Sequence, residues 1–301
     1  MARARLLLPS LCLATCAVAA VSCANEAPAR AEDTTPQRVV VLAPAAAEMM
    51  EALGVMDRVA GVGEFGPWPA ALTGAPRVGG YDAPNVERAL DLGCDLVLTA
   101  ASVAASPAHA RLESLGIPVT ALDTSTFEGV FAALDEVGRL FGETQRADEL
   151  AAEMREELRA IEARSAGLAR RRVLVVVGRD PLFVAGPGSH VDEMIRIAGG
   201  DNVASDLGAP YQRASLEALL ARRPEVIVDL SDNRPGAPRG REPGGWARWP
   251  FLPAVRAGRV YHVDPARLAI PGLQLPQMTR LLARLVHPEE FGEAETVEMG
   301  A

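Results

Sequence analysis

Short apolar runs alternate with amphipathic stretches along most of the chain, the pattern of strands and helices in turn. In the first half, strands are predicted at the run RVVVLAP and at 58–62, 95–98 and 118–121. Helices are predicted between them, at 45–54, 86–92, 107–115 and 127–141. Strands that alternate with helices predict an α/β fold with a parallel sheet covered on both faces.

A longer amphipathic stretch follows the first half. Its apolar residues fall on one helical face, while acids and bases alternate on the other. A helix over 143–171 has a length of roughly 40 Å, more than a crossover within one sheet needs. The stretch is interpreted as a rigid helix that links two lobes, with an apolar stripe formed by Leu150, Met154, Leu158, Ile161 and Leu168.

After this helix the chain repeats its opening pattern. A strand that starts at an arginine leads to DEMIRIAGG, which parallels the earlier AEMMEALG, and strands at 225–230 and 259–263 precede a closing helix at 273–288. Tyr81 lies six residues before Glu87, and Tyr211 lies six before Glu217. Internal duplication explains both repeats and predicts two similar, Rossmann-like α/β lobes, at 38–142 and 172–292, followed by a tail at 293–301.

The N-terminus has a different character. Residues 1–22 combine two arginines with an apolar run typical of a signal peptide. The small residues of AVSC resemble a bacterial lipobox, which predicts lipidation of Cys23 and a polar tether over 23–37. Simple secretion is the alternative.

Charge and metal-ligand spacing exclude several classes of function. The net charge of −9 argues against a nucleic-acid partner. No metal site held by side chains is expected, because the four histidines are far apart and lack ligand spacing. Cys94 is expected to be a small buried hydrophobe.

A serine beside a histidine occurs in GPGSH, at Ser189 and His190. The stretch is not the GxSxG of a nucleophile elbow. Ser189 and Asp192 instead match a variant of the capping box at the start of a helix. Capping is therefore favoured over catalysis, and no catalytic residue is predicted.

The few aromatic residues stand in loops rich in glycine and proline instead of at periodic positions. This placement favours a ligand platform, with local loop packing as the alternative. Arg213 and Arg267 either meet acidic groups of a ligand or are solvated. The aromatic candidates are Trp68, Tyr81, Tyr211, Trp246 and Trp249.

Glu87 and Glu217 each follow a good N-cap residue, Asn85 or Ser215, by two positions. The helix dipole explains each carboxylate alone. It does not explain their recurrence at matching places in both lobes, which favours a partner with two basic patches.

Six runs, among them VGGYDAPNVERALDLGCDLVL, PLFVAGPGSHVDEMIRIAGGDNVASD and LPAVRAGRVYHVD, resemble the class III substrate-binding proteins of bacterial ABC importers for cobalamin and ferric siderophores. The resemblance covers about Arg38 to Phe291 in the same order. It implies two α/β lobes bridged by one long helix, with the ligand in the cleft between them. The chain departs from the family at EFGPWP and at the long NRPGAPRGREPGG.

The resemblance also implies roles for residues. Glu87 and Glu217 are expected to dock on arginines of the two permease subunits. Tyr81, Tyr211 and Trp68 are expected to line the cleft. Four further residues are expected to border it: Phe183, Arg267, Trp246 and Trp249.

The favoured function is a monomeric lipoprotein, in the periplasm or at the cell surface, that needs no cofactor and catalyses no reaction. It captures a bulky metal chelate and delivers it to an ABC importer made of a permease dimer and its ATPase. A corrinoid is favoured slightly over a ferric siderophore because candidate basic residues are few. Haem is disfavoured because no tyrosine or histidine stands out as an axial ligand. The alternatives are an extracytoplasmic hydrolase that uses Ser189 and His190, and a sensor on the same scaffold.

Overall fold

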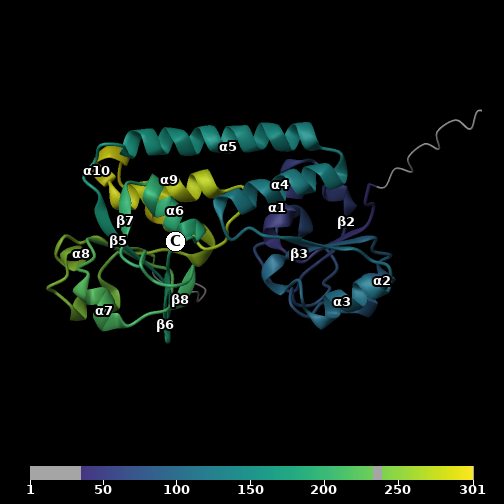
Figure 1. The fold of residues 1–301 in the computed structure, drawn as a ribbon, viewed down its shortest axis with the longest axis horizontal. Coiled ribbons are helices and arrows are strands. Elements are labelled where there is room, and N and C mark those ends of the chain that lie inside the picture. The colour runs from purple at the N-terminus through teal and green to yellow at the C-terminus, as the bar shows by residue number, and fades with distance from the viewer. Residues whose placement is uncertain (1–34, 233–238, 301) are drawn as a thin grey trace, which may run out of the picture. The chain divides into compact units, whose positions relative to one another are not determined.

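The computed structural model describes residues 35–232 and 239–300. The chain divides into two units, Met1–Thr34 and Thr35–Ala301, and the described residues belong to the second. The predicted signal peptide and Cys23 lie outside the described residues. Within the second unit, Figure 1 shows two groups of strands surrounded by helices, with the long helix α5 (Thr144–Ser165) running past both.

The first sheet is entirely parallel, as the alternation of strands and helices predicted. Its strand order is β2-β1-β3-β4. All of β1 and nearly all of β3 are buried, which is expected of strands with helices on both faces. The elements are β1 (Val39–Val41), β2 (Val59–Val62), β3 (Leu96–Ala100) and β4 (Val119–Leu122), with α1 (Pro44–Ala52), α2 (Val86–Asp91), α3 (Pro107–Ser114) and α4 (Phe127–Phe141).

The second sheet has seven strands and is mixed, so the parallel prediction holds for part of it. Its order is β10-β11-β9-β5-β6-β8, and β7 also pairs with β5. The parallel pairs join β5, β7, β9 and β11, while β6, β8 and β10 pair antiparallel to their neighbours. The strands are β5 (Arg171–Arg179), β6 (Leu182–Ala185), β7 (Gly200–Asn202), β8 (Tyr211–Arg213), β9 (Val226–Asp229), β10 (Gly240–Arg241) and β11 (Val260–His262).

Within 35–232 and 239–300, five helices accompany this sheet. The closing helix α9 was predicted at 273–288, and the structure places it at Leu275–Val286. The segment predicted as a long loop at 233–253 contains β10 and a 3-10 helix at Gly244–Arg248, while 233–238 lie outside the described residues. The helices are α6 (His190–Ile197), α7 (Leu216–Ala221), α8 (Pro253–Arg256), α9 and α10 (Pro288–Phe291).

Helix α5 is shorter than the predicted linking helix. It has 22 residues, which corresponds to roughly 33 Å. The chain leaves the helix at Ala166, and Gly167 has a φ of +86°, which glycine adopts without strain. Leu168 therefore lies beyond the helix, and its predicted place in the apolar stripe is wrong.

The buried face of α5 holds both halves of the unit together. Met154, Leu158 and Ile161 belong to one core cluster that also includes Val39 of β1 and Val173 of β5. On the exposed side, Arg280 of α9 donates to Glu157 at 2.9 Å. Because one continuous core runs under α5, we expect little independent movement of the two sheets at the helix.

In each half, an acidic side chain accepts hydrogen bonds from the backbone at the start of the first strand. Asp95 accepts hydrogen bonds from the backbone amides of Gln37 and Arg38, at 2.8 and 3.0 Å. In the second half Glu225 accepts from the backbone amide of Arg172 at 3.0 Å. Each of these acids follows its docking candidate by eight residues, so the end of the sequence repeat joins two neighbouring strands in both sheets.

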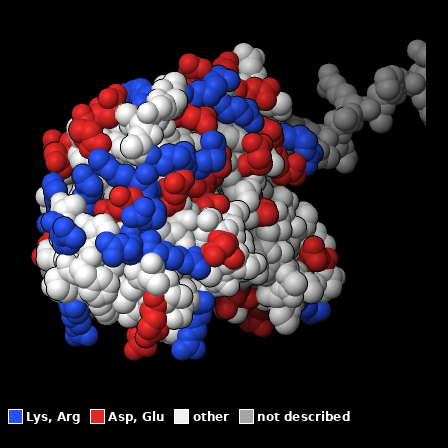
Figure 2. Space-filling model, turned by 60° about the vertical axis from the view of Figure 1, so that its left-hand side comes forward, with Lys and Arg blue, Asp and Glu red and all other residues white. Residues whose placement is uncertain are grey.

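On one face of the molecule, acidic and basic side chains are interleaved rather than gathered in separate patches (Figure 2). Figure 2 shows a face on which blue side chains lie beside red ones. All 30 basic residues are arginine, since the sequence contains no lysine. Pairs such as Arg196 with Glu162, at 2.5 Å, contribute about 0–1 kcal/mol each at an exposed position. Among the described helices, none combines the length and apolar character that crossing a bilayer requires.

Candidate functional site

A cavity of about 200 Å³ is lined by residues from both halves of the unit. In the first half it is lined by residues 100–102 and 122–125, which lie at the carboxyl ends of β3 and β4. Ligands of open α/β sheets bind at these carboxyl ends. The second half contributes His190, Tyr211, Ala269 and Pro271. This cavity is therefore the candidate for the predicted cleft.

Tyr211 and His190 form a hydrogen-bonded pair on the wall of the cavity. The Tyr211 hydroxyl lies 3.0 Å from His190 Nδ1, and Nε2 of the same ring lies 3.1 Å from the carbonyl oxygen of Leu268. A carbonyl oxygen only accepts, so Nε2 carries the proton in the neutral ring and Nδ1 accepts. The Tyr211 hydroxyl therefore donates its proton toward His190.

Both members of this pair are neutral at neutral pH, His190 because it is buried and Tyr211, which is 38% exposed, because it is a phenol. His190 has an exposed fraction of 2%, and removal from water lowers the pKa of its imidazole. The same effect raises the pKa of the Tyr211 phenol, only partly offset by the nearby Ser189 hydroxyl. The pair is thus a phenol and a neutral imidazole at neutral pH.

Asp123 follows β4 and brings a negative charge to the cavity. Its Oδ1 accepts from the backbone amide of Ser125 at 2.9 Å. Hydrogen bonds from the Ser125 hydroxyl and amide lower the pKa of the Asp123 carboxyl. The side chain is exposed and remains ionised at neutral pH.

Ser189 caps helix α6, as predicted. Its Oγ accepts from the amide of Asp192 at 3.1 Å and donates to the carbonyl oxygen of Gly186 at 2.9 Å. Asp192 accepts in return from the amide of Gly188 at 3.1 Å. Since both ring nitrogens of His190 are engaged elsewhere, the geometry favours capping over a serine–histidine pair.

Gly186 lets two backbone segments approach beside the cavity. A Cβ at this position would lie 2.4 Å from the carbonyl oxygen of Ala209, and the Gly186 amide donates to Pro210 at 2.7 Å. We expect Gly186→Ala to destabilise the fold by about 1–3 kcal/mol, because the segment leading into Tyr211 must shift. Urea unfolding monitored by circular dichroism measures this. The control is Gly208→Ala, whose Cβ meets nothing within 4 Å, and equal midpoints for the two variants would contradict the expectation.

The aromatic candidates of the first half do not line this cavity. Tyr81 has an exposed fraction of 49% and precedes α2. Trp68 is half-buried and packs against the main core. Tyr211 is the aromatic candidate that the structure brings to the cavity between the halves.

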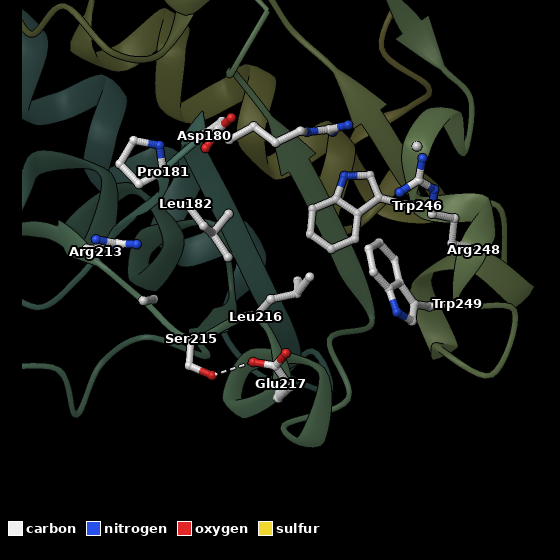
Figure 3. A pocket seen from close by; sticks show the side chains of 13 residues that line it. Asp180, Pro181, Leu182, Arg213, Ser215, Leu216, Glu217, Trp246, Arg248 and Trp249 are labelled. Atoms are coloured by element: carbon white, nitrogen blue, oxygen red, sulfur yellow. Dashed lines mark hydrogen bonds between the residues drawn. The ribbon is translucent and has the colours of Figure 1, made fainter.

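Trp246 and Trp249 border a different pocket, of about 830 Å³ and formed wholly by the second half. Trp246 is a core residue with an exposed fraction of 3%, and its indole donates to Asp229 at 2.8 Å. Trp249 packs beside it, with ring centroids 5.6 Å apart. Figure 3 shows both rings on one side of the pocket, with Leu182 and Pro181 across from them. The Gly/Pro-rich sequence around Trp246 predicted a loop residue beside the ligand, and the structure instead packs Trp246 into the core of the second half.

Phe183 and Arg267 also stand apart from the cavity. Phe183 lies on β6, paired with Arg213 of β8, and its side chain has an exposed fraction of 37%. Arg267 lies near a separate cavity of about 140 Å³ beside α9, together with Gln274 and Glu298. Arg213 lines the large pocket of the second half.

Glu87 and Glu217 occupy equivalent positions in their helices. Asn85 accepts from the Arg88 amide at 2.9 Å and Ser215 accepts from the Ala218 amide at 3.3 Å, which confirms both predicted N-caps. Both glutamates are exposed, and neither forms an ion pair within the described residues. Their helices α2 and α7 appear at the lower side of Figure 1, opposite α5.

Glu217 stands at the rim of the large pocket. Figure 3 shows its carboxylate at the lower edge, where it accepts from the Ser215 hydroxyl at 2.9 Å. A hydrogen bond from the backbone amide of Glu217 itself, together with the bond from Ser215, lowers the pKa of the Glu217 carboxyl, so the carboxylate is ionised. Arg213 and Arg248 line the same pocket.

Two residues of the cavity escaped the sequence-based prediction. Asp123 lies two residues after the predicted strand 118–121, and its position at the carboxyl end of a parallel strand is a signal that could have found it. His190 was considered beside Ser189, whereas its partner is Tyr211, 21 residues later. No group of three or more potential metal-ligating side chains occurs among the described residues.

Comparison with known proteins agrees with this architecture. The sequence profile described as periplasmic binding protein matches residues 39–266. The ABC transporter substrate-binding lipoprotein YvrC of Bacillus subtilis is 29% identical over 265 residues, covering 86% of this chain and 82% of that protein. The vitamin B12-binding protein of Salmonella typhimurium is 31% identical over 191 residues, covering 64% of this chain and 71% of that protein.

A solved structure shows the same fold. The periplasmic heme-binding protein from Pseudomonas aeruginosa superposes with a TM-score of 0.71 at 27% identity, covering 85% of this chain and 94% of that one. The match of the family profile spans most of the chain, including both sheets and the helix between them. The chain therefore belongs to the periplasmic binding protein family, as a class III substrate-binding protein of ABC transporters.

Proposed function

We propose that this chain captures a bulky metal chelate, a corrinoid or a ferric siderophore, and delivers it to the permease of an ABC importer. The observation that carries the proposal is the cavity at the carboxyl ends of β3 and β4, which Tyr211 and His190 close from the other half. The similarity to vitamin B12-binding and heme-binding proteins supports a metal chelate as cargo.

Delivery is proposed to use Glu87 and Glu217 as the two contacts with the permease. They are exposed, lie in the first turns of helices at matching places in the repeat, and form no ion pair within the described residues. Two exposed carboxylates at matching places of the repeat suit arginines on a partner. A pseudo-symmetric permease dimer offers such arginines twice.

The chain is proposed to act outside the cytoplasm, tethered through a lipid on Cys23. The apolar run before AVSC and the polar stretch after it support this anchor. The lipoprotein among its relatives adds to that support.

The cargo class is tested by titrating the purified chain without its signal peptide. We expect cyanocobalamin or a ferric catecholate to bind at one site per chain, with haemin titrated as a third probe, and binding is followed by absorbance and calorimetry. The vitamin B12-binding and heme-binding relatives motivate the first and last probe. A chain that binds none of the three, or haemin alone, would contradict the proposed function.

A further inference from the structure

We propose that the cavity between the two halves selects a hydrogen-bond-donating edge of the cargo, with Tyr211 and Asp123 as the acceptors that determine specificity. The inference rests on the proposed function and narrows its cargo to chelates rimmed by N–H donors, such as the primary amides of a corrinoid. Chelates edged by carboxylates are disfavoured at the same place.

Tyr211 can offer only acceptor capacity to the cargo. A phenol has one proton, and here that proton points toward His190 Nδ1 at 3.0 Å. The imidazole cannot return a proton from that nitrogen, because its own N–H is held by the Leu268 carbonyl at 3.1 Å. A cargo group that meets Tyr211 in the cavity therefore has to donate.

Asp123 also requires a hydrogen-bond donor on the cargo, and it carries a negative charge. Its carboxylate is ionised and accepts hydrogen bonds from the hydroxyl and the amide of Ser125, so toward the cargo it offers only acceptor capacity. The 11 residues that line the cavity contain no arginine, so no cation there neutralises a second carboxylate. A second carboxylate brought against Asp123 is repelled, whereas an amide N–H or an ammonium is stabilised there.

The size of the cavity defines which part of the cargo enters. About 200 Å³ is below the roughly 300–1,000 Å³ of pockets that enclose a whole ligand, so the cavity receives one edge of a bulky chelate. A corrin ring is rimmed by amide side chains, and haem ends in two carboxylates. Arginines that would suit carboxylates, Arg213 and Arg248, lie in the other pocket, beside Glu217.

The test compares cyanocobalamin and haemin by calorimetric titration of the wild-type chain, Asp123→Asn and Tyr211→Phe. Wild type is expected to bind cyanocobalamin more tightly than haemin. Asp123→Asn should weaken cyanocobalamin about ten-fold, since hydrogen bonds to charged groups are the stronger ones, and should strengthen haemin a few-fold. Tyr211→Phe should weaken cyanocobalamin about five-fold. A purely structural effect of Asp123→Asn would weaken both ligands.

Tyr261→Phe is the matched control, because the Tyr261 hydroxyl is buried in the second half with no hydrogen-bond partner among the described residues. It should leave both affinities unchanged. The inference is overturned, with the proposed function intact, if a ferric catecholate binds wild type more tightly than cyanocobalamin does. Tighter binding of haemin overturns both the inference and the proposed choice of a corrinoid or a siderophore as cargo. Cyanocobalamin affinities within two-fold of wild type in both test variants would overturn it as well. A wild-type chain that binds no chelate overturns the proposed function and this inference together.

Discussion

Replacing Glu87 and Glu217 together by arginine is expected to abolish chelate uptake while cargo binding by the purified chain stays unchanged. Both side chains are exposed and lie outside the residues that line the cavity. Charge reversal sets like charges against the arginines proposed on the permease, at two contacts at once. Uptake of the identified cargo into cells that depend on this chain should fall by about 100-fold or more, whereas calorimetry should give the wild-type Kd.

The control reverses two acids that lie elsewhere. Glu128 stands in the first turn of α4 behind the N-cap Thr126, and Glu153 is exposed on α5. Glu128→Arg with Glu153→Arg changes the net charge equally and should keep uptake near the wild-type rate. Normal uptake in the Glu87 and Glu217 double variant would remove the docking proposal. The alternative function, a sensor on the same scaffold, would then be tested next.

Asp229→Ala is expected to destabilise the fold by about 2–4 kcal/mol, the largest stability effect among the changes considered. The Asp229 side chain is almost fully buried and accepts from the Trp246 indole at 2.8 Å and the Ser231 amide at 3.0 Å. Arg179 also donates to it. Its removal leaves the indole and the amide without an acceptor in the core, although Arg179 is half-exposed and can turn to water.

The Asp229 carboxylate also makes the free energy of unfolding depend on pH in the acidic range. Burial alone raises the pKa of Asp229, but bonds from Ser231 and Trp246 and the charge of Arg179 outweigh it and lower the pKa. A lowered folded-state pKa gives stability that is present above the ordinary carboxyl pKa, about 4, and is lost as the pH falls through the folded value. Asp229→Ala should lose this part of the acid dependence.

Urea unfolding at pH 7 and at pH 3 measures both effects. The destabilisation by Asp229→Ala should be smaller at the lower pH. Asp206→Ala serves as the control, because the Asp206 side chain is 70% exposed in its pair with Arg222 and should cost no more than about 1 kcal/mol. Equal costs for the buried and the exposed aspartate would contradict the assignment of Asp229 as a core acceptor.

Local features of the fold could be predicted because neighbouring residues determine them. The N-caps at Asn85, Ser189 and Ser215 each form a bond to the residue three positions later, so a short stretch of sequence contains both partners. The strands of the first sheet follow from buried β-branched runs. The repeat of Tyr81 with Glu87 and Tyr211 with Glu217 likewise needs no long-range information, and it indicated the duplicated architecture.

The chain's own sequence thus determined the two α/β halves, the helix between them, the capping role of Ser189 and the family. Tertiary structure alone decided that Trp246 is a core residue and that Tyr211 faces a cavity with Asp123 from the other half. It also decided that His190 accepts a hydrogen bond from Tyr211, and that α5 ends at Ser165. The physical reason is range: caps and periodicity depend on residues within one or two turns, whereas burial and the partner of a polar atom depend on segments brought together by the whole chain.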